Sequence, residues 1–366
     1  MYSALSADKT GFPNPQQESL GGRVQGWIDR QLTVGALQNS CPYASQIGSC
    51  IELPLYQWCS DYFVKLGQNV YFGDILHGIN PELPDTFLEF DEQIWKMLYS
   101  YPYFLSRGMS KARSQVIQSL KMYFEAPQSQ RRDQAAWLIN TMEDEIKALG
   151  IDDDNLAILV FHLYFAINTN TRKTVFWMLT YLLHDPALLR VYRKEVEPAF
   201  NGSRLVDPFY IQDAAKCAQV NAIWHETLRL SGWSASIRLI KQDTVIGGKF
   251  MCKGNRVLVP HRLLHFDSRI FGEDTHSFRH ERWLQSDLGR SPSWRPFGGG
   301  KTMCSGRFLA RFSVTTFVAT LLRRFDIEMV GDPPFPRADE GRPVLGIMSI
   351  KEGEDFKIRL SPRPVF

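Results

Sequence analysis

The segment Arg295–Arg307, RPFGGGKTMCSGR, decides the fold assignment because it surrounds a single thiol with glycines. Cys304 stands directly before an apolar, helix-patterned stretch, and residues 295–323 are expected to form a loop and a following helix. Backbone N–H groups and the positive end of the helix dipole would then favour the thiolate form of Cys304, which suits a nucleophile or a metal ligand. Gly298–Gly300 and Gly306 carry no side chains, so a broad, flat ligand could approach the backbone.

Composition excludes several classes of protein. The chain has 366 residues, 44% hydrophobic and 22% charged, with a formal charge of +3, which gives no nucleic-acid footprint. Six cysteines occur without a CxxC pair, which argues against a zinc knuckle, a redox dithiol or a disulfide scaffold. We see no signal peptide and no transmembrane segment; the longest apolar run, Leu156–Ile167, is too short to cross a bilayer.

Helical periodicity dominates most of the chain. Residues 1–52 are rich in glycine, proline and polar residues and are expected to be a poorly ordered lead-in. Apolar residues at three- and four-residue spacing predict helices from about 53 to 150, and residues 152–185 are predicted to be one central helix that ends before Pro186. Alternating β-branched residues predict short strands in residues 235–262. The sequence therefore predicts a mainly α fold with small β-sheets.

Two further motifs lie upstream of the thiol. Glu226 and Arg229 in HETLR are three residues apart on a predicted helix, which alone indicates no more than a surface ion pair worth about 0.2–0.5 kcal/mol. Arg282 in HERW lies between this helix and Cys304 and could complete a buried cluster of one carboxylate and two guanidinium groups. Each motif alone is weak evidence of function, but the order and spacing of the motifs along the chain are specific.

Together these motifs resemble those of cytochromes P450, the haem-thiolate enzymes. The resemblance covers the chain from about Tyr71 to its end and implies one domain, residues 1–366, of that fold. It implies that Cys304 is the axial thiolate of haem b, iron protoporphyrin IX. The remaining roles that it implies are packing of Phe297 against the haem, close approach of the helix at Gly300 and Gly306, and a structural triad of Glu226, Arg229 and Arg282.

The sequence departs from the family pattern at the expected haem propionates. Thr302 stands where the family often has arginine or histidine, two residues before the cysteine. Arg238 is therefore a candidate propionate partner, and a charge at a strand edge is an equally good reading. We find no Trp-x-x-x-Arg pattern before Tyr71, although a helix with that pattern normally grips a propionate in the family.

A second departure lies in the central helix. Counting back from Pro186 aligns Ala166–Thr171, AINTNT, with the family's oxygen-activating pattern, so that Ala166 faces the cofactor and Thr171 ends the motif. Asn170 takes the place of the proton-delivering threonine and Thr169 that of the acid. An asparagine amide can hydrogen-bond a ligand but cannot relay a proton as a hydroxyl does. Asn170 and the following Phe176–Trp177 resemble the branch that holds sterol 7-hydroxylases and prostacyclin synthase.

The resemblance leads us to expect a fold that lacks the N-terminal anchor and the first β-rich lobe. Three hypotheses follow. The first is a monooxygenase that hydroxylates or epoxidises a hydrophobic small molecule, such as a terpenoid, steroid-like or alkaloid intermediate of fungal secondary metabolism. The second is an isomerase or dehydratase that needs no reductase, and the third is a catalytically impaired haem-binding remnant.

The expected partners of the monooxygenase are dioxygen and NADPH-cytochrome P450 reductase, and the protein is expected to be a monomer. It is expected on the cytoplasmic side, peripheral at the endoplasmic reticulum. The reductase would need a basic docking face. The candidates for that face are Arg190, Arg193, Lys194, Lys301 and Arg307.

Overall fold

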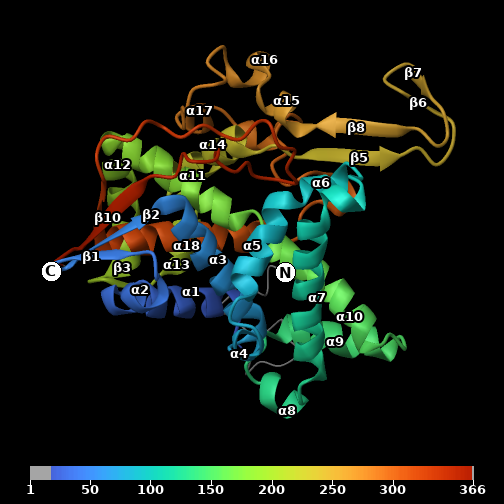
Figure 1. The fold of residues 1–366 in the computed structure, drawn as a ribbon. Helices are drawn as coiled ribbons and strands as arrows, with labels where there is room; N and C mark the ends of the chain where they lie inside the picture. The colour runs from blue at the N-terminus through green and yellow to red at the C-terminus, as the bar shows by residue number, and fades with distance from the viewer. Residues whose placement is uncertain (1–17, 365–366) are drawn as a thin grey trace.

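The computed structural model describes residues 18–364 (Figure 1). The helices of the first half are α1 Leu20–Gln31, α2 Val34–Ser40, α3 Leu55–Phe72, α4 Ile75–Ile79, α5 Leu83–Gln93, α6 Trp95–Leu98, α7 Arg107–Glu125, α8 Gln128–Arg131 and α9 Trp137–Ala148. Those of the second half are α10 Asp153–Asn168, α11 Thr171–His184, α12 Pro186–Val196, α13 Pro208–Gln212, α14 Ala218–Ser231, α15 His261–His265, α16 Ser268–Phe271, α17 Arg282–Gln285 and α18 Arg307–Arg324. The mainly α fold with small sheets is confirmed.

The strands form small antiparallel sheets. In the four-stranded sheet, in the order β1-β2-β10-β9, a strand from the start of the described chain pairs with one from its end, with Ile51 opposite Leu360. The β5–β8 ribbon and the β6–β7 hairpin project from one end of the molecule (Figure 1). The strands are β1 Ser45–Ile47, β2 Cys50–Pro54, β3 Phe200–Asn201, β4 Arg204–Leu205, β5 Ala235–Leu239, β6 Thr244–Ile246, β7 Lys249–Met251, β8 Arg256–Pro260, β9 Phe325–Met329 and β10 Lys357–Pro362.

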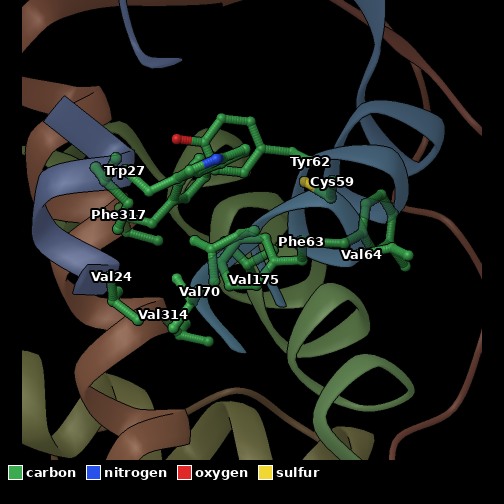
Figure 2. Close-up of a cluster of buried hydrophobic side chains, with 14 of the residues drawn as sticks. Val24, Trp27, Cys59, Tyr62, Phe63, Val64, Val70, Val175, Val314 and Phe317 are labelled. Atoms are coloured by element: carbon green, nitrogen blue, oxygen red, sulfur yellow. The ribbon is translucent and has the colours of Figure 1, made fainter. Parts of the chain in front are cut away.

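The centre of the core is a bundle of α1, α3, α11 and α18 (Figure 2). Aromatic rings interlock there: the ring of Tyr62 lies 4.7 Å from that of Trp27 and 4.6 Å from that of Phe317, centroid to centroid. Val175 of α11 and Val314 of α18 are fully buried in the same cluster. Such aromatic pairs add to the stabilisation that burial gives. This bundle fixes α11 and α18, the two helices that border the candidate site.

The prediction of a poorly ordered lead-in over residues 1–52 is wrong for its described part. Residues 1–17 lie outside the described residues, but α1, α2, β1 and β2 follow from residue 20. The side chains of Val24, Trp27 and Ile28 are buried against the bundle. Burial of the apolar face of α1 outweighs the weak intrinsic helix propensity of its glycines, and so orders this part of the chain.

The prediction of one central helix over residues 152–185 also needs correction. The helix begins where it was predicted, and the Asp152 side chain caps its N-terminus by accepting a hydrogen bond from the Asn155 N–H at 2.9 Å. The helix is interrupted, however, between the end of α10 and the start of α11, at Thr169 and Asn170. The sequence Asn-Thr-Asn-Thr explains the break, because short polar side chains compete with the helix for backbone hydrogen bonds. The Thr171 hydroxyl does so by donating to the carbonyl of Ile167 at 3.3 Å.

Candidate functional site

The loop before α18 folds back on itself at the thiol. The backbone N–H of Cys304 donates to the carbonyl of Phe297 at 3.0 Å, which brings these two residues together. Gly298 and Gly300 have φ angles of 76° and 68°, in the left-handed region that favours glycine. A Cβ added to Gly306 would lie 3.7 Å from the Cys304 Sγ, which is an ordinary contact. The protein alone therefore does not require glycine at 306.

Cys304 lines a cavity of about 490 Å³. Part of its wall comes from the thiol loop, including Phe297, Thr302 and Gly306, and another part comes from Ala166, Asn170 and Thr171 at the junction of α10 and α11. This size is in the range of small-molecule sites. The apolar side chains of the wall include Val24, Phe63, Leu66, Val70, Leu138, Leu163, Ile167, Leu228, Leu309, Leu345 and Ile347.

The two residues that sequence analysis associated with propionates lie together in this wall. The Arg238 guanidinium of β5 donates to the Thr302 Oγ1 at 2.7 Å, and both residues are exposed. His261, which hydrogen-bonds Ser234 and Ser236, adds to the same region. Burial, with the charges of Arg295 and Arg238, lowers the pKa of His261. The positive charge of Arg238 beside Thr302 therefore offers a place for an anionic group of a ligand.

The helix interruption presents one amide to the cavity. The Oδ1 of Asn170 accepts a hydrogen bond from the Ile347 N–H at 2.9 Å, so its amide N–H groups are the donors left for a ligand. A Cβ on Gly346 would collide with this carboxamide, so glycine is needed there for the close approach. Sequence analysis missed Gly346 and Ile347, because only the fold brings them to Asn170.

Thr169 does not line the large cavity. Its side chain is buried and its hydroxyl donates to the carboxylate of Asp91 on α5. Sequence analysis gave Thr169 the position of the family's acid, and in the structure its hydroxyl binds a carboxylate from another helix instead of lining the large cavity. The side chains of the two residues at the interruption have different surroundings: Asn170 lines the large cavity, and Thr169 binds a buried carboxylate.

Glu226, Arg229 and Arg282 form one buried cluster. Both carboxylate oxygens of Glu226 accept from the Arg229 guanidinium at 2.8 Å, and Oε1 also accepts from the Arg282 Nε at 3.1 Å. The indole of Trp283 and the backbone N–H of Arg279 complete the set of donors at 2.8 and 3.0 Å. Arg229 further binds the carbonyls of residues 265, 275 and 277. The cluster thus ties α14 to the irregular segment that leads to the thiol loop.

The donor chemistry of the cavity fits a haem held by one thiolate. Within residues 18–364, no group of three or more His, Cys, Asp and Glu side chains is placed to hold a metal ion together. Cys304 instead offers a single thiol to a large, mostly apolar cavity, and Arg238 lies in the wall for an acidic substituent. One thiolate, apolar walls and a cation are what an iron porphyrin with carboxylate side chains requires.

Comparison with known proteins agrees with this geometry. A family model described as Cytochrome P450 matches residues 67–357. The chain belongs to the cytochrome P450 family. Family membership implies a haem-thiolate cofactor, for which Cys304 is the candidate ligand in the matched region.

The relatives of this cytochrome P450 come from fungi and animals. It is 28% identical to Cytochrome P450 monooxygenase poxD of Penicillium oxalicum, over 68% of this chain and 52% of that protein. It is 25% identical to Cytochrome P450 7A1 of Sus scrofa, over 84% of this chain and 66% of that protein. The similarity to the sterol 7-hydroxylase branch is thereby supported, and the chain spans about half to two thirds of the length of these relatives.

Relatives of a third kind are self-sufficient monooxygenases. The chain is 31% identical to Self-sufficient cytochrome P450 monooxygenase CYP505E4 of Penicillium freii, over 54% of this chain and 19% of that protein.

In the described part of this cytochrome P450, no helix is both long and apolar enough to cross a bilayer.

Proposed function

We propose that the protein is a haem-thiolate monooxygenase that inserts one oxygen atom from dioxygen into a hydrophobic small molecule. The observation that carries this proposal is the cavity that contains both the Cys304 thiol and the Asn170 amide. When bound, haem b supplies the activation of dioxygen. The chain's residues then have to hold the cofactor, bind the substrate and exclude water.

Each part of the cavity has its own task in this proposal. Cys304 is the ligand, and Phe297, drawn to it by the 3.0 Å backbone bond, shields the sulfur. Arg238 and Thr302 hold an acidic edge of the cofactor through their hydrogen-bonded pair. Asn170 donates its amide N–H to an oxygen atom of the ligand. The aliphatic and aromatic walls bind the substrate by removing apolar surface from water.

The substrate class that we propose is a terpenoid, steroid-like or alkaloid intermediate of secondary metabolism. The mostly apolar wall favours a hydrocarbon skeleton with few polar groups. Two relatives point the same way: 5-beta-cholestane-3-alpha,7-alpha-diol 12-alpha-hydroxylase of Sus scrofa and Cholesterol 7-alpha-monooxygenase of Cricetulus griseus are 26% identical to this chain. The names of both relatives describe steroid substrates.

The electrons would come from NADPH through a separate cytochrome P450 reductase at the endoplasmic reticulum. Three of the five basic residues considered for its docking, Arg190, Lys194 and Lys301, are exposed. The other two are engaged within the chain: Arg193 with Asp326 at 3.0 Å, and Arg307 with the Cys304 carbonyl at 2.8 Å. The exposed three are therefore the better candidates.

A second candidate function is an isomerase or dehydratase that works without a reductase. Asn170 favours it, because its amide can bind an oxygenated substrate but cannot pass on a proton. The experiment incubates the purified protein with a panel of sterols and terpenoids in ¹⁸O₂, with and without NADPH and reductase. The monooxygenase predicts one ¹⁸O atom in the product, dependent on NADPH and absent from Cys304→Ser. Unlabelled product formed without NADPH would overturn the monooxygenase in favour of the isomerase.

A further inference from the structure

A buried carboxylate stands behind the helix interruption, outside the large cavity. Asp91 of α5 is 4% exposed, and one of its oxygens accepts from the Thr169 hydroxyl. The other oxygen binds the guanidinium of Arg172 and lies 3.0 Å from the Nζ of Lys173, both on α11 and both buried. Burial alone would raise the pKa of Asp91, but the charges of Lys173 and Arg172 and the Thr169 hydrogen bond outweigh it and lower the pKa.

The carboxylate and the active-site amide share a second, smaller cavity. It has a volume of about 20 Å³ and is lined by Asp91, Lys173, Thr169 and Asn170, among others. That is room for about one water molecule beside several polar groups. Asn170 therefore has the large cavity on one side and a charged, water-sized space on the other.

Asn170 is held from both sides of the interruption. On one side the Ile347 N–H and the bare backbone of Gly346 fix its carboxamide. On the other side its neighbour Thr169 is tied to Asp91, and Asp91 is tied in turn to the first turn of α11. A hydrogen bond to an ionised group is stronger than one between neutral groups, so the Thr169–Asp91 bond restrains the junction more than an ordinary hydroxyl bond would.

We propose that Asp91 is a positioning residue for the reaction of the neighbouring cavity. Through Thr169 it fixes the interruption between α10 and α11, and so directs the Asn170 amide N–H at an acceptor atom of the ligand. Asp91 itself touches neither ligand nor cofactor. The inference rests on the proposed function for its role in the reaction, while its structural part can be tested without any turnover.

The first test measures hydrogen exchange of the backbone amides of residues 168–172. Thr169→Val removes the hydroxyl but keeps the ion pairs of Asp91 and the side-chain shape, so the protein is expected to fold. These amides should exchange about tenfold faster or more, as expected for the loss of a hydrogen bond to a charged group. Thr169→Ser should restore the wild-type rates. Thr180→Val is the matched control, because Thr180 is buried on α11 and donates to the Phe176 carbonyl, away from the junction.

The second test uses cyanide as a probe, titrated into the ferric, haem-loaded protein and followed by absorption. Asn170→Ala should weaken cyanide binding about threefold to tenfold, the effect of one hydrogen bond. Thr169→Val should weaken it by a smaller factor, and Thr169→Ser and Thr180→Val should leave it unchanged. Gly346→Ala, which pushes the carboxamide directly, should resemble Asn170→Ala.

The inference would be overturned by unchanged exchange of residues 168–172 in Thr169→Val, or by cyanide binding that responds to Asn170→Ala but not to Thr169→Val. A wild-type protein that binds no haem would contradict the proposed function alone, because the exchange experiment still reports on the junction. Faster exchange throughout the chain in Thr169→Val, rather than at the junction, would also contradict a positioning role.

Discussion

The carboxylates of Glu226 and Asp91 are each buried between two cations, but the chain assembles the two clusters differently. Glu226 meets Arg229 one turn away on its own helix, and its other donors come from residues 279–283, which lead into α17. Asp91 meets Arg172 and Lys173 on another helix, 81 and 82 positions along the chain. The Glu226 cluster fixes the segment that leads to the thiol loop, and the Asp91 cluster fixes the start of α11 at the cavity.

The comparison teaches that equal charge content does not mean equal stabilisation. Glu226 accepts from five donors, and its guanidinium partner Arg229 is 0% exposed. Arg172 has partners besides Asp91: the hydroxyls of Ser60 and Tyr56 and the half-buried carboxylate of Glu92. Loss of the carboxylate leaves one buried cation without a counter-charge in each cluster, Arg229 in the first and Lys173 in the second, since Arg282 keeps Asp274 and Arg172 keeps Glu92. It removes the acceptor of five donors at Glu226 but of only three at Asp91, so the larger loss is expected at Glu226.

The largest effect is expected from Glu226→Gln. The variant leaves the buried guanidinium of Arg229 without a counter-charge, which should lower the free energy of unfolding by about 3–5 kcal/mol. Denaturant unfolding of the purified protein measures it. Glu281→Gln is the matched control on the same segment, since that carboxylate is exposed, and it should stay within about 0.5 kcal/mol of wild type. Equal stability of the two variants would show that the cluster contributes little.

A smaller loss is expected from Asp91→Asn. Lys173 loses its counter-charge, but the new amide can still accept from the Thr169 hydroxyl and Arg172 keeps its other partners. We therefore expect a loss of about 2–3 kcal/mol, at or below the lower end for a broken buried pair. The same unfolding experiment gives the value. A loss larger than that of Glu226→Gln would reverse the comparison and make the helix junction the more important of the two.

Mild acid should weaken the first cluster and spare the second. Burial, with the charge of Arg311, lowers the pKa of His225 to about 4, and the ring lies 4.8 Å from that of Trp283, which donates to Glu226. Below pH 6.5 this histidine binds a proton in the unfolded chain but not in the folded chain. The free energy of unfolding that it contributes above pH 6.5 is therefore lost as the pH falls toward 4. The charges of Lys173 and Arg172 hold the pKa of Asp91 below its usual range, so mild acid should not break its ion pairs.

The measurement is the free energy of unfolding between pH 7 and 5.5, where His225 should account for a loss of about 1 kcal/mol. His225→Phe keeps an aromatic ring against Trp283 and should flatten this part of the profile. The remaining slope belongs to residues such as His265, whose pKa burial lowers to about 3. An unaltered profile in His225→Phe would exclude this histidine as the acid-sensitive group.

The two clusters also show what sequence can reveal. Glu226 and Arg229 are visible because helix geometry brings residues three apart together, and the family resemblance added Arg282. Asp91 could not be identified from sequence, since its contacts arise only when the fold brings α5 within reach of the start of α11. Two features of the sequence could have indicated this cluster. The cations Arg172 and Lys173 lie in a mostly apolar helix, and the polar run before them is typical of a helix interruption.

The thiol loop was predictable because residues close in sequence determine its turns. The order of the lead-in was not predictable in this way. Glycines at 298 and 300 mark backbone turns that the structure shows at positive φ. By contrast, the helix at Leu20–Gln31 owes its order to burial of Trp27 against Tyr62 from α3, a tertiary contact that composition does not record.

The central claim is that Cys304 is the axial ligand of a haem in the large cavity. Its most direct test is the absorption spectrum of the reduced, carbon monoxide-bound protein. Wild type should show the thiolate-shifted band, and so should Cys252→Ser, which removes an exposed thiol elsewhere. Cys304→Ser should lose the band. An unshifted band in wild type, or a shifted band that survives Cys304→Ser, would contradict the account.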